Sequence, residues 1–170
     1  MRNLEAKFRL ADLDAAAARA SKLGYKQRSV LDQCDTFFRV PNGKLKLREE
    51  GHRAVLIFYS RDDSGPLKLS SYEIVAISHA EETRAMLAAA MGTIATVIKK
   101  RILMKRDHIR FHLDRVEGLG NFGEIEAVIP DGQDPELSRA AVDELLAALQ
   151  IGPADLIDVS YFEMLLAATR

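Results

Sequence analysis

The segment NLEAKFR, residues 3–9, places apolar residues at every second position and charged or amide residues between them. Because successive side chains of a β-strand point to opposite sides, this spacing predicts a strand with one apolar and one polar face. A single half-exposed strand with solvated charges would need no special explanation. The same alternation returns in KLKLREE, residues 44–50, and in later segments, which indicates that several charged faces converge on one polyanion site.

The pattern along the rest of the chain, together with turn and capping residues, predicts about eight strands and four helices. The predicted strands are residues 3–9, 28–40, 44–50, 53–61, 68–77, 96–105, 109–116 and 122–129. The predicted helices are residues 12–23, 79–91 with Ser78 as its cap, 134–149, and a final amphipathic helix from residue 153 to about 168. Turns of hairpin length, such as Pro41-Asn42-Gly43, join strand pairs, so the sheet is expected to be largely antiparallel.

The apolar stripes of the helices are expected to pack on the apolar faces of the strands. If the sheet curls, the other strand faces line an ionic interior. Buried charges are tolerated when they are paired or hydrated, and a water-filled tunnel meets that condition.

Length and composition favour one compact domain over residues 1–170. No low-complexity stretch divides the chain, and a protein of this size buries roughly 70% of its unfolded surface. The single cysteine, Cys34, excludes an internal disulfide and is typical of a reducing compartment. No segment approaches the ~18 apolar residues that cross a bilayer, so we expect a cytoplasmic protein with no membrane partner.

The overall charge gives no reason to expect a nucleic-acid partner, since 24 Lys and Arg residues nearly balance 25 Asp and Glu residues. The distribution of charge along the predicted strands is more informative. The charged faces carry eight bases, namely Lys7, Arg9, Lys44, Lys46, Arg48, Lys99, Arg101 and Arg110. They carry five acids, namely Glu5, Glu50, Asp114, Glu124 and Glu126.

The acids suggest a metal site. Glu124 and Glu126 lie on one face of a predicted strand, about 6.6–6.8 Å apart by strand rise. At an effective dielectric constant near 20 their repulsion costs about 2 kcal/mol, which a divalent cation or a neighbouring base would remove. With Glu5 and Asp114 they offer oxygen ligands suited to Mg²⁺ or Mn²⁺. A cross-strand ladder with lysine and arginine on a solvated sheet is the structural alternative.

The bases recur at every second position on three strands, as Lys44/Lys46/Arg48, Lys99/Arg101 and Arg110/His112. Such sets commonly bind phosphates, with lysine acting as a point charge and arginine as a bidentate donor. A solvated strand face is again the structural alternative for each set. Base-rich faces combined with an acidic cluster fit a metal–polyphosphate site better than they fit charged faces that only contact solvent.

These motifs resemble the CYTH superfamily of triphosphate tunnel metalloenzymes, and most closely its class IV adenylate cyclase branch. The family opens with a Glu-x-Glu-x-Lys strand, which corresponds to NLEAK at residues 3–7. Further matches are DTFF (35–38), LKLRE (45–49), KKR (99–101), the series Asp114, GLG (118–120), Phe122, Glu124 and Glu126, and the closing SY (160–161) with LL (165–166). The resemblance covers nearly the whole chain.

The resemblance implies an α+β fold: a closed eight-stranded antiparallel β-barrel, the triphosphate tunnel, with helices packed outside. It implies cyclisation of ATP to cyclic AMP and pyrophosphate, or hydrolysis of inorganic or thiamine triphosphate, with Mg²⁺ or Mn²⁺. The implied metal ligands are Glu5, Asp114, Glu124 and Glu126. The implied substrate-binding residues are Lys7, Lys46, Arg48, Arg61, Lys68, Lys99, Arg101 and Arg110, and Glu5, Lys7 and Arg110 are expected to serve catalysis. A homodimer is a further implication.

One residue departs from the family pattern, because Asn3 stands where the family has its first glutamate. An amide oxygen is a weaker ligand than a carboxylate, which keeps open a third function, non-catalytic binding of nucleotides or polyphosphate. Outside the motifs, Tyr161 is interpreted as core packing and His112 as either structural or substrate-contacting. Whether Tyr59 and Tyr72 face the tunnel depends on strand phase, which the pattern leaves open.

Overall fold

The computed structural model describes residues 2–62, 68–129 and 135–168 of the chain. The strands in this part of the chain are β1 (Arg2–Arg9), β2 (Lys26–Phe38), β3 (Lys44–Glu50), β4 (Arg53–Asp62), β5 (Lys68–Ile77), β6 (Thr93–Arg106), β7 (Ile109–Val116) and β8 (Gly120–Ile129). The helices are α1 (Leu13–Lys22), α2 (Ala80–Met91), α3 (Pro135–Leu149) and α4 (Tyr161–Ala168), with a 3₁₀ turn at Pro153–Asp155. The predicted order of elements is therefore confirmed.

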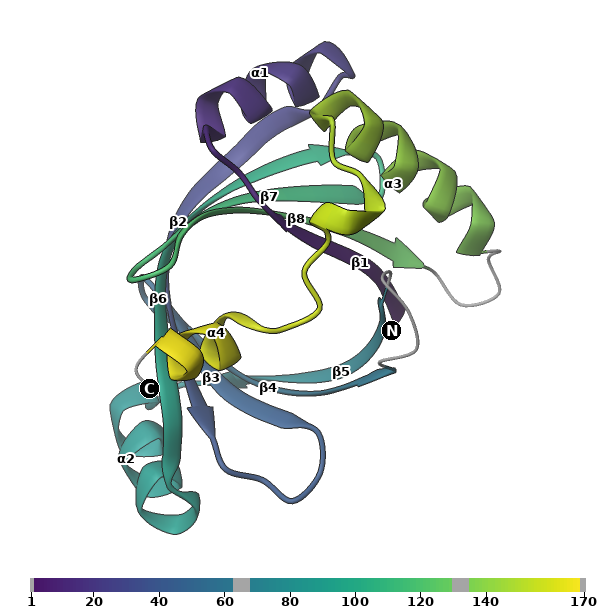
Figure 1. Cartoon of the computed structure of the whole chain (residues 1–170). Helices are drawn as coiled ribbons and strands as arrows, with labels where there is room; N and C mark the ends of the chain where they lie inside the picture. The colour runs from purple at the N-terminus through teal and green to yellow at the C-terminus, as the bar shows by residue number, and fades with distance from the viewer. Residues whose placement is uncertain (1, 63–67, 130–134, 169–170) are drawn as a thin grey trace.

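The strands form an antiparallel sheet that curls until its last strand lies beside its first (Figure 1). Hydrogen-bonded neighbours follow the order β1-β5-β4-β3-β2-β6-β7-β8, and β8 pairs with β1 along its whole length. The contact between β1 and β5 is shorter, because it joins residues 2–5 to residues 68–71 and ends there. The predicted α+β fold, an eight-stranded antiparallel sheet with helices outside, is confirmed. The pairing of β1 with β5 therefore rests on this short ladder alone.

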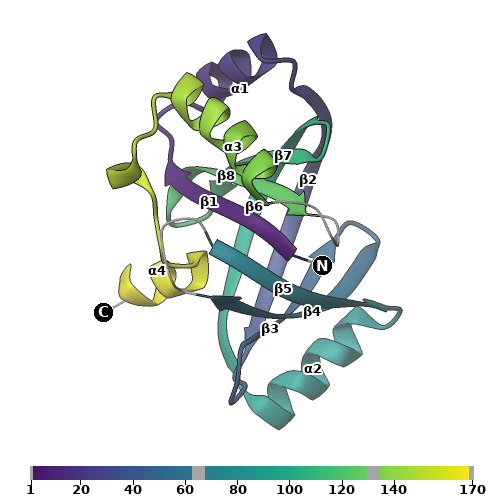
Figure 2. The same ribbon diagram turned by 90° about the vertical axis from the view of Figure 1, so that its right-hand side faces the viewer.

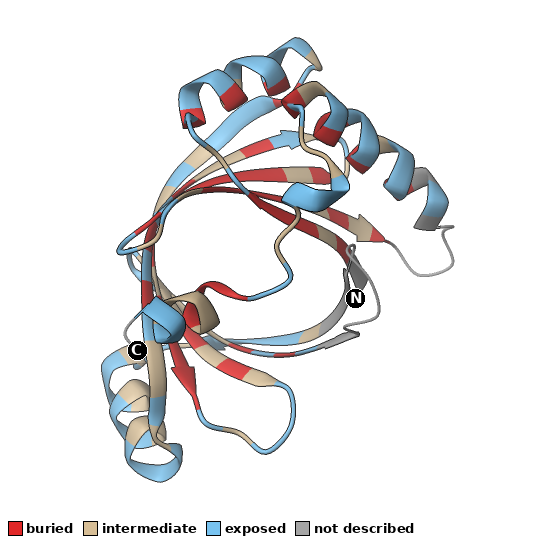
Figure 3. Ribbon diagram, in the orientation of Figure 1, coloured by how far each residue is buried: buried red, intermediate tan, exposed pale blue. Residues whose placement is uncertain are grey.

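The apolar faces of β1, β7 and β8 point outward and are covered by α1 and α3. Phe8, Phe111 and Ile125 are fully buried there against Val142 and Leu145 of α3. Figure 3 shows the buried positions gathered on these strands and on the helix sides that face them. Because one face of each strand is used for this core, the alternate residues must point into the curled sheet.

A second, smaller core lies under α2. Leu87 and Ala88 of this helix pack against a cluster that contains Phe38, Leu45 and Leu47. Figure 2 shows α2 at the far end of the molecule from α1 and α3. None of the helices in the described ranges is long and apolar enough to cross a membrane.

The structure corrects two helix predictions. The segment after Pro153 is not one continuous helix, because Leu156 bridges to Phe8 and the amide of Ile157 donates to the Lys7 carbonyl oxygen at 2.8 Å. That pairing requires extended backbone, so α4 begins only at Tyr161. The cap of α2 is His79, not Ser78, and its side chain makes no capping hydrogen bond. The expected capping residue of α3, Asp134, lies outside the described residues.

Candidate active site

Inward-facing side chains line a cavity of about 180 Å³, and every strand of the sheet contributes to its wall. The wall brings together these predicted site residues: Glu5, Lys7, Lys46, Arg48, Lys99, Arg101, Arg110, Glu124 and Glu126. Asp114 lies behind the wall with no exposed surface. The predictions for Arg61 and Lys68 concern side chains that lie outside the described part of the chain, as does the side chain of Asn3.

Asp35 is the counter-ion of three cations in the wall. Arg48, its partner in the β2–β3 register, donates from Nε to Oδ1 at 2.6 Å and from Nη2 to Oδ2 at 2.7 Å. Lys46 Nζ donates to Oδ2 at 3.0 Å, and Lys99 Nζ lies 3.9 Å from the same oxygen. Burial alone would raise the pKa of Asp35, but the three cations outweigh burial and lower it well below its usual range. The ionised carboxylate thereby fixes the Arg48 guanidinium in place.

A second buried carboxylate, Asp114, fixes Arg101. The two residues are partners in the β6–β7 register, and Arg101 donates from Nε at 2.7 Å and from Nη2 at 2.6 Å. Nη2 also donates to Oε2 of Glu124 at 2.7 Å, and the Tyr161 hydroxyl donates to Oδ2 of Asp114 at 3.0 Å. Paired, charge-assisted hydrogen bonds of this kind hold a guanidinium rigidly. In this arrangement both oxygens of Asp114 bind other side chains.

The acidic end of the cavity is formed where β1, β8 and β7 meet. Glu5 lies directly opposite Glu126 in the β1–β8 register, and Arg110 lies opposite Glu126 on the other side, with Nη1 3.8 Å from Oε2. Carboxylates paired across strands repel each other, and a divalent cation bound between them relieves that repulsion. Glu124 points from the same face of β8 as Glu126, so three carboxylates converge here.

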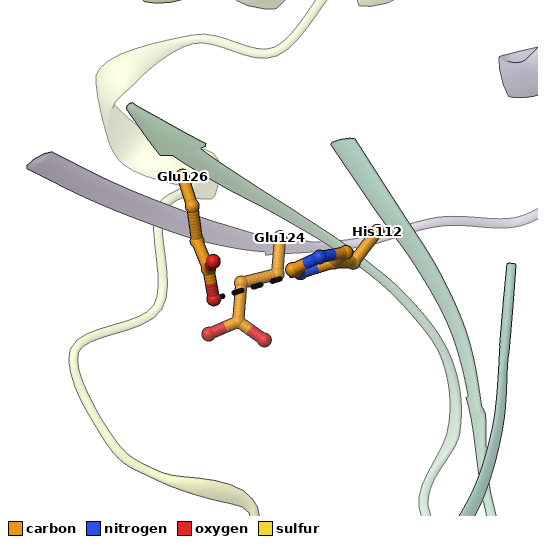
Figure 4. Close-up of side chains that lie close together, drawn as sticks. All are labelled: His112, Glu124 and Glu126. Atoms are coloured by element: carbon orange, nitrogen blue, oxygen red, sulfur yellow. Dashed lines mark ion pairs between the residues drawn. The ribbon is translucent and has the colours of Figure 1, made fainter. Parts of the chain in front are cut away.

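His112 joins this acidic end from β7. Its Nδ1 atom lies 3.6 Å from Oε1 of Glu126, and Figure 4 shows the imidazole directed toward the two glutamates of β8. Ligand atoms of His112, Glu124 and Glu126 all lie within 4.8 Å of one another, close enough to hold one metal ion. Burial first, and the charge of Arg101 second, lower the pKa of His112 to about 4, so the imidazole is neutral at pH 7.

Lys99, which is buried, and Lys46, which is partly buried, have charges that depend on pH near neutrality. Burial and the nearby Arg101 lower the pKa of Lys99 to about 7. Burial and Arg48 lower the pKa of Lys46 to about 8. An anion bound in the cavity would stabilise the charged form of each lysine and raise both pKa values. Anion binding above pH 7 is therefore expected to be coupled to proton uptake.

We expect the affinity for a triphosphate to fall as pH rises from 7 to 9. Unliganded Lys99 loses its proton in this range and must regain it to bind the anion, which costs up to about tenfold in affinity per pH unit for each lysine. Calorimetric titration with inorganic triphosphate in buffers of different ionisation enthalpy measures both the affinity and the proton uptake.

Lys99→Arg should make this pH dependence shallower, because a guanidinium keeps its charge in this range. Lys100→Arg is the matched control, since Lys100 is the exposed neighbour on the same strand. An affinity that stays constant or rises between pH 7 and pH 9 would contradict the expected coupling.

One side of the cavity is apolar. Tyr59 and Tyr72 are direct partners in the β4–β5 register, as are Ile57 and Ile74, and all four side chains line the cavity. Ile74 is 54% exposed although it points inward. The strand phase that the sequence pattern left open is thereby settled: both tyrosines face the cavity. The wall therefore combines ionic strands with one apolar and aromatic sector, β4–β5.

The segment that leads into α4 crosses the opening of the curled sheet (Figure 1). Ser160, at the end of this segment, and Tyr161, the first residue of α4, contribute to the lining of the cavity. The Tyr161 ring packs edge-on against Phe122 with centroids 5.0 Å apart, and the ammonium of Lys7 lies 4.5 Å from its centroid. Lys7 Nζ also donates to the carbonyl oxygen of Val159 at 3.4 Å. The interpretation of Tyr161 as core packing is thus incomplete, since the residue also lines the cavity and binds Asp114.

Sequence reasoning gave no role to Asp35 and left open whether the tyrosines of β4 and β5 face the cavity. It interpreted His112 as either structural or substrate-contacting, and the structure places this side chain beside Glu126. Asp35 stands within the DTFF motif at residues 35–38, yet a lone acid gives no sign of its partners, Lys46 and Arg48, which come from the next strand. His112 shares a face with Arg110 at two-residue spacing, and that spacing was the available indication.

Comparison with protein families shows to which family the chain belongs. The family model described as the CYTH domain matches residues 1–161. The chain belongs to the CYTH family. The resemblance inferred from the sequence motifs is thereby confirmed. CYTH family members are metal-dependent enzymes that act on triphosphates.

Relatives of this CYTH chain match it over nearly the whole of both chains. A Methanocaldococcus jannaschii protein named "putative adenylate cyclase" is 25% identical over 173 residues, which span 96% of this chain and 98% of the relative. A Pyrococcus horikoshii structure has a TM-score of 0.85 at 21% identity, covering 95% of this chain and 98% of its own. A "putative adenylyl cyclase" of Hippeastrum, said to reveal a dominant triphosphatase activity, has a TM-score of 0.70 at 16% identity, with 98% and 96% covered. At these identities the two structures support the fold alone.

Proposed function

We propose that this CYTH protein is a metal-dependent enzyme that converts ATP to cyclic AMP and pyrophosphate. The observation that carries the proposal is the convergence of carboxylates and bases on one cavity, with Glu5, Glu124 and Glu126 at one end and fixed guanidinium groups beside them. This combination suits a metal-bound triphosphate, whose oxygens need both a cation and several donors. The name of the Methanocaldococcus relative agrees with the cyclase reaction.

The proposed roles combine the positions of the described side chains with the family resemblance, on which the roles of Arg61 and Lys68 rest alone. Glu5, Glu124 and Glu126 would hold Mg²⁺ or Mn²⁺, with Asp114 as the nearby fourth carboxylate that positions Arg101. The proposed phosphate-binding residues are Lys7, Lys46, Arg48, Arg61, Lys68, Lys99, Arg101 and Arg110. Glu5, Lys7 and Arg110 are proposed to act directly in catalysis. When bound, the metal ion would supply Lewis-acid stabilisation of the charge on the triphosphate.

The proposed reaction is in-line attack of the ribose 3′-hydroxyl on the α-phosphorus, with loss of the hydroxyl proton and departure of pyrophosphate. Arg48 and Arg101 would bind phosphate oxygens without reorganising, because Asp35 and Asp114 already fix their guanidinium groups. Such preorganised donors lower the barrier most when charge builds up on the leaving group. Catalysis then depends on positioning and electrostatics, without a covalent intermediate.

The apolar sector of β4–β5 supports a nucleotide over inorganic triphosphate. A substrate made only of phosphate gains nothing from contact with Ile57, Ile74 and two tyrosine rings. An aromatic base gains from burying both its own surface and the half-exposed side chain of Ile74. We therefore place the nucleoside against this sector.

Ile74→Ser is expected to weaken ATP binding about five- to tenfold, which corresponds to burial of roughly one to two fewer methylene groups. Binding of inorganic triphosphate should be unchanged, because the ionic wall is intact. Val75→Ser is the matched control, since Val75 is the next residue of β5, is 59% exposed and points to the opposite face. Calorimetric titration of each variant with ATP and with inorganic triphosphate measures the two affinities. An equal loss of affinity for both ligands would contradict the placement of the nucleoside against this sector.

Triphosphate hydrolysis is the second candidate function, favoured by the triphosphatase activity described for the Hippeastrum relative. It uses the same cavity, with water in place of the ribose hydroxyl. Product analysis with ATP, inorganic triphosphate and thiamine triphosphate separates the two reactions. The single domain over residues 1–170, the cytoplasmic location and the homodimer expected from the sequence stay predictions.

A further inference from the structure

The imidazole of His112 is a buried polar group that the phosphate-binding roles leave unexplained. Its Nδ1 atom has no hydrogen-bond partner among the described residues, and the side chain is 7% exposed. Oε1 of Glu126, at 3.6 Å, is too distant for a hydrogen bond. Buried polar atoms nearly always have a partner, so an unpartnered nitrogen beside two carboxylates points to a ligand.

The position of His112 is fixed by the strand register. Its partner on β8 is Glu124, and its partner on β6 is Leu103, whose side chain offers no hydrogen bond. The imidazole is therefore held between an apolar neighbour and the acidic end of the cavity. Arg101 orients the Glu124 carboxylate by donating to its Oε2 atom at 2.7 Å. Side chains that are oriented in this way are typical of metal sites, where neighbouring groups position the ligands.

We propose that His112 is a metal ligand, and that its Nδ1 atom completes with Glu124 and Glu126 a mixed nitrogen–oxygen site that prefers a transition metal ion to Mg²⁺. The three ligand atoms lie within 4.8 Å of one another (Figure 4). Mg²⁺ takes oxygen ligands almost exclusively, whereas Mn²⁺ and the later divalent ions also accept imidazole nitrogen. The inference deepens the proposed function, on which it rests for the role of the metal, by specifying the kind of ion.

The test uses the full-length protein with Mn²⁺ alone, in a nitrogen-free buffer and without substrate. Pulsed electron paramagnetic resonance of bound Mn²⁺ should show modulation from one directly coordinated ¹⁴N nucleus. His112→Gln should abolish that modulation, because the amide offers an oxygen in place of the nitrogen. The affinity for Mn²⁺ should fall by about tenfold or more, while the affinity for Mg²⁺ changes much less.

His108→Gln is the matched control. His108 lies at the turn between β6 and β7, where its Nε2 atom is 3.1 Å from the hydroxyl of Ser138, away from the carboxylates. This variant should keep both the ¹⁴N modulation and the Mn²⁺ affinity. Three results would each overturn the proposal: Mn²⁺ bound without ¹⁴N modulation, modulation that survives in His112→Gln, or no Mn²⁺ binding to the wild-type protein.

A parallel assay with ATP and inorganic triphosphate in Mg²⁺ separates this inference from the proposed function. Turnover in Mg²⁺ together with no ¹⁴N modulation would refute His112 as a metal ligand but would not contradict the proposed function. Coordination of ¹⁴N to Mn²⁺ in a protein that turns over no triphosphate would support His112 as a metal ligand and refute the proposed enzymatic function.

Discussion

Replacing Glu126 by glutamine is expected to reduce metal-dependent turnover by at least about 100-fold while leaving the fold intact. Glu126 stands between Glu5 on one neighbouring strand and Arg110 on the other, and its Oε1 atom faces His112. It is therefore central to the acidic end where the metal is proposed to bind. Glutamine keeps the shape of the side chain but removes the negative charge that binds the cation.

The measurement is the rate of product formation from ATP in Mg²⁺ and in Mn²⁺, together with a thermal unfolding curve. Glu73→Gln is the matched control, because Glu73 is an exposed glutamate of β5 outside the cavity lining. It should keep the wild-type rate. Full activity in Glu126→Gln would remove Glu126 from the metal site, and loss of the folded state would be detected in the unfolding curve.

Replacing Asp35 by asparagine is expected to destabilise the protein by about 3–5 kcal/mol, because it leaves buried cations without their counter-ion. Asp35 accepts hydrogen bonds from Arg48 and Lys46 and lies 3.9 Å from Lys99. For a protein of this size the loss corresponds to a fall in Tm of roughly 10 °C. Calorimetry of the unliganded protein measures the change.

Inorganic triphosphate should restore much of this loss, since its oxygens would take the place of the missing carboxylate. We expect the ligand to raise the Tm of Asp35→Asn by more than it raises that of the wild-type protein. Asp32→Asn is the control, because Asp32 is an exposed residue of the same strand. A variant as stable as wild type, or one whose Tm triphosphate does not raise, would refute the role of Asp35 as an internal counter-ion.

The strands and most site residues could be predicted because the period of a β-strand is two. Once Leu4, Ala6 and Phe8 are assigned to the core, Glu5 and Lys7 must point the other way, and the same logic applies to KLKLREE. The eight predicted strand segments correspond to the eight strands in the described part of the chain. Local pattern therefore predicted many of the charged side chains that line the cavity, such as Glu5, Lys7 and Lys46.

Features that depend on distant pairing could not be predicted in this way. The break before α4 arises because Leu156 and Ile157 meet the edge of β1, some 150 positions earlier in the chain. Tyr59 and Tyr72 lie on strands without a clear local alternation, and their inward direction is seen only in the folded sheet. The pairing of Asp35 with Arg48 follows from the β2–β3 register, which sequence spacing alone leaves open.

The most direct test of the proposed function is product analysis. The purified protein is incubated with Mg²⁺ or Mn²⁺ and, separately, with ATP, inorganic triphosphate and thiamine triphosphate, and the products are resolved. The proposed function predicts cyclic AMP and pyrophosphate in equal amounts from ATP. Orthophosphate without cyclic AMP would contradict the cyclase reaction in favour of a triphosphatase, and tight triphosphate binding with no product from any substrate would contradict an enzymatic function altogether.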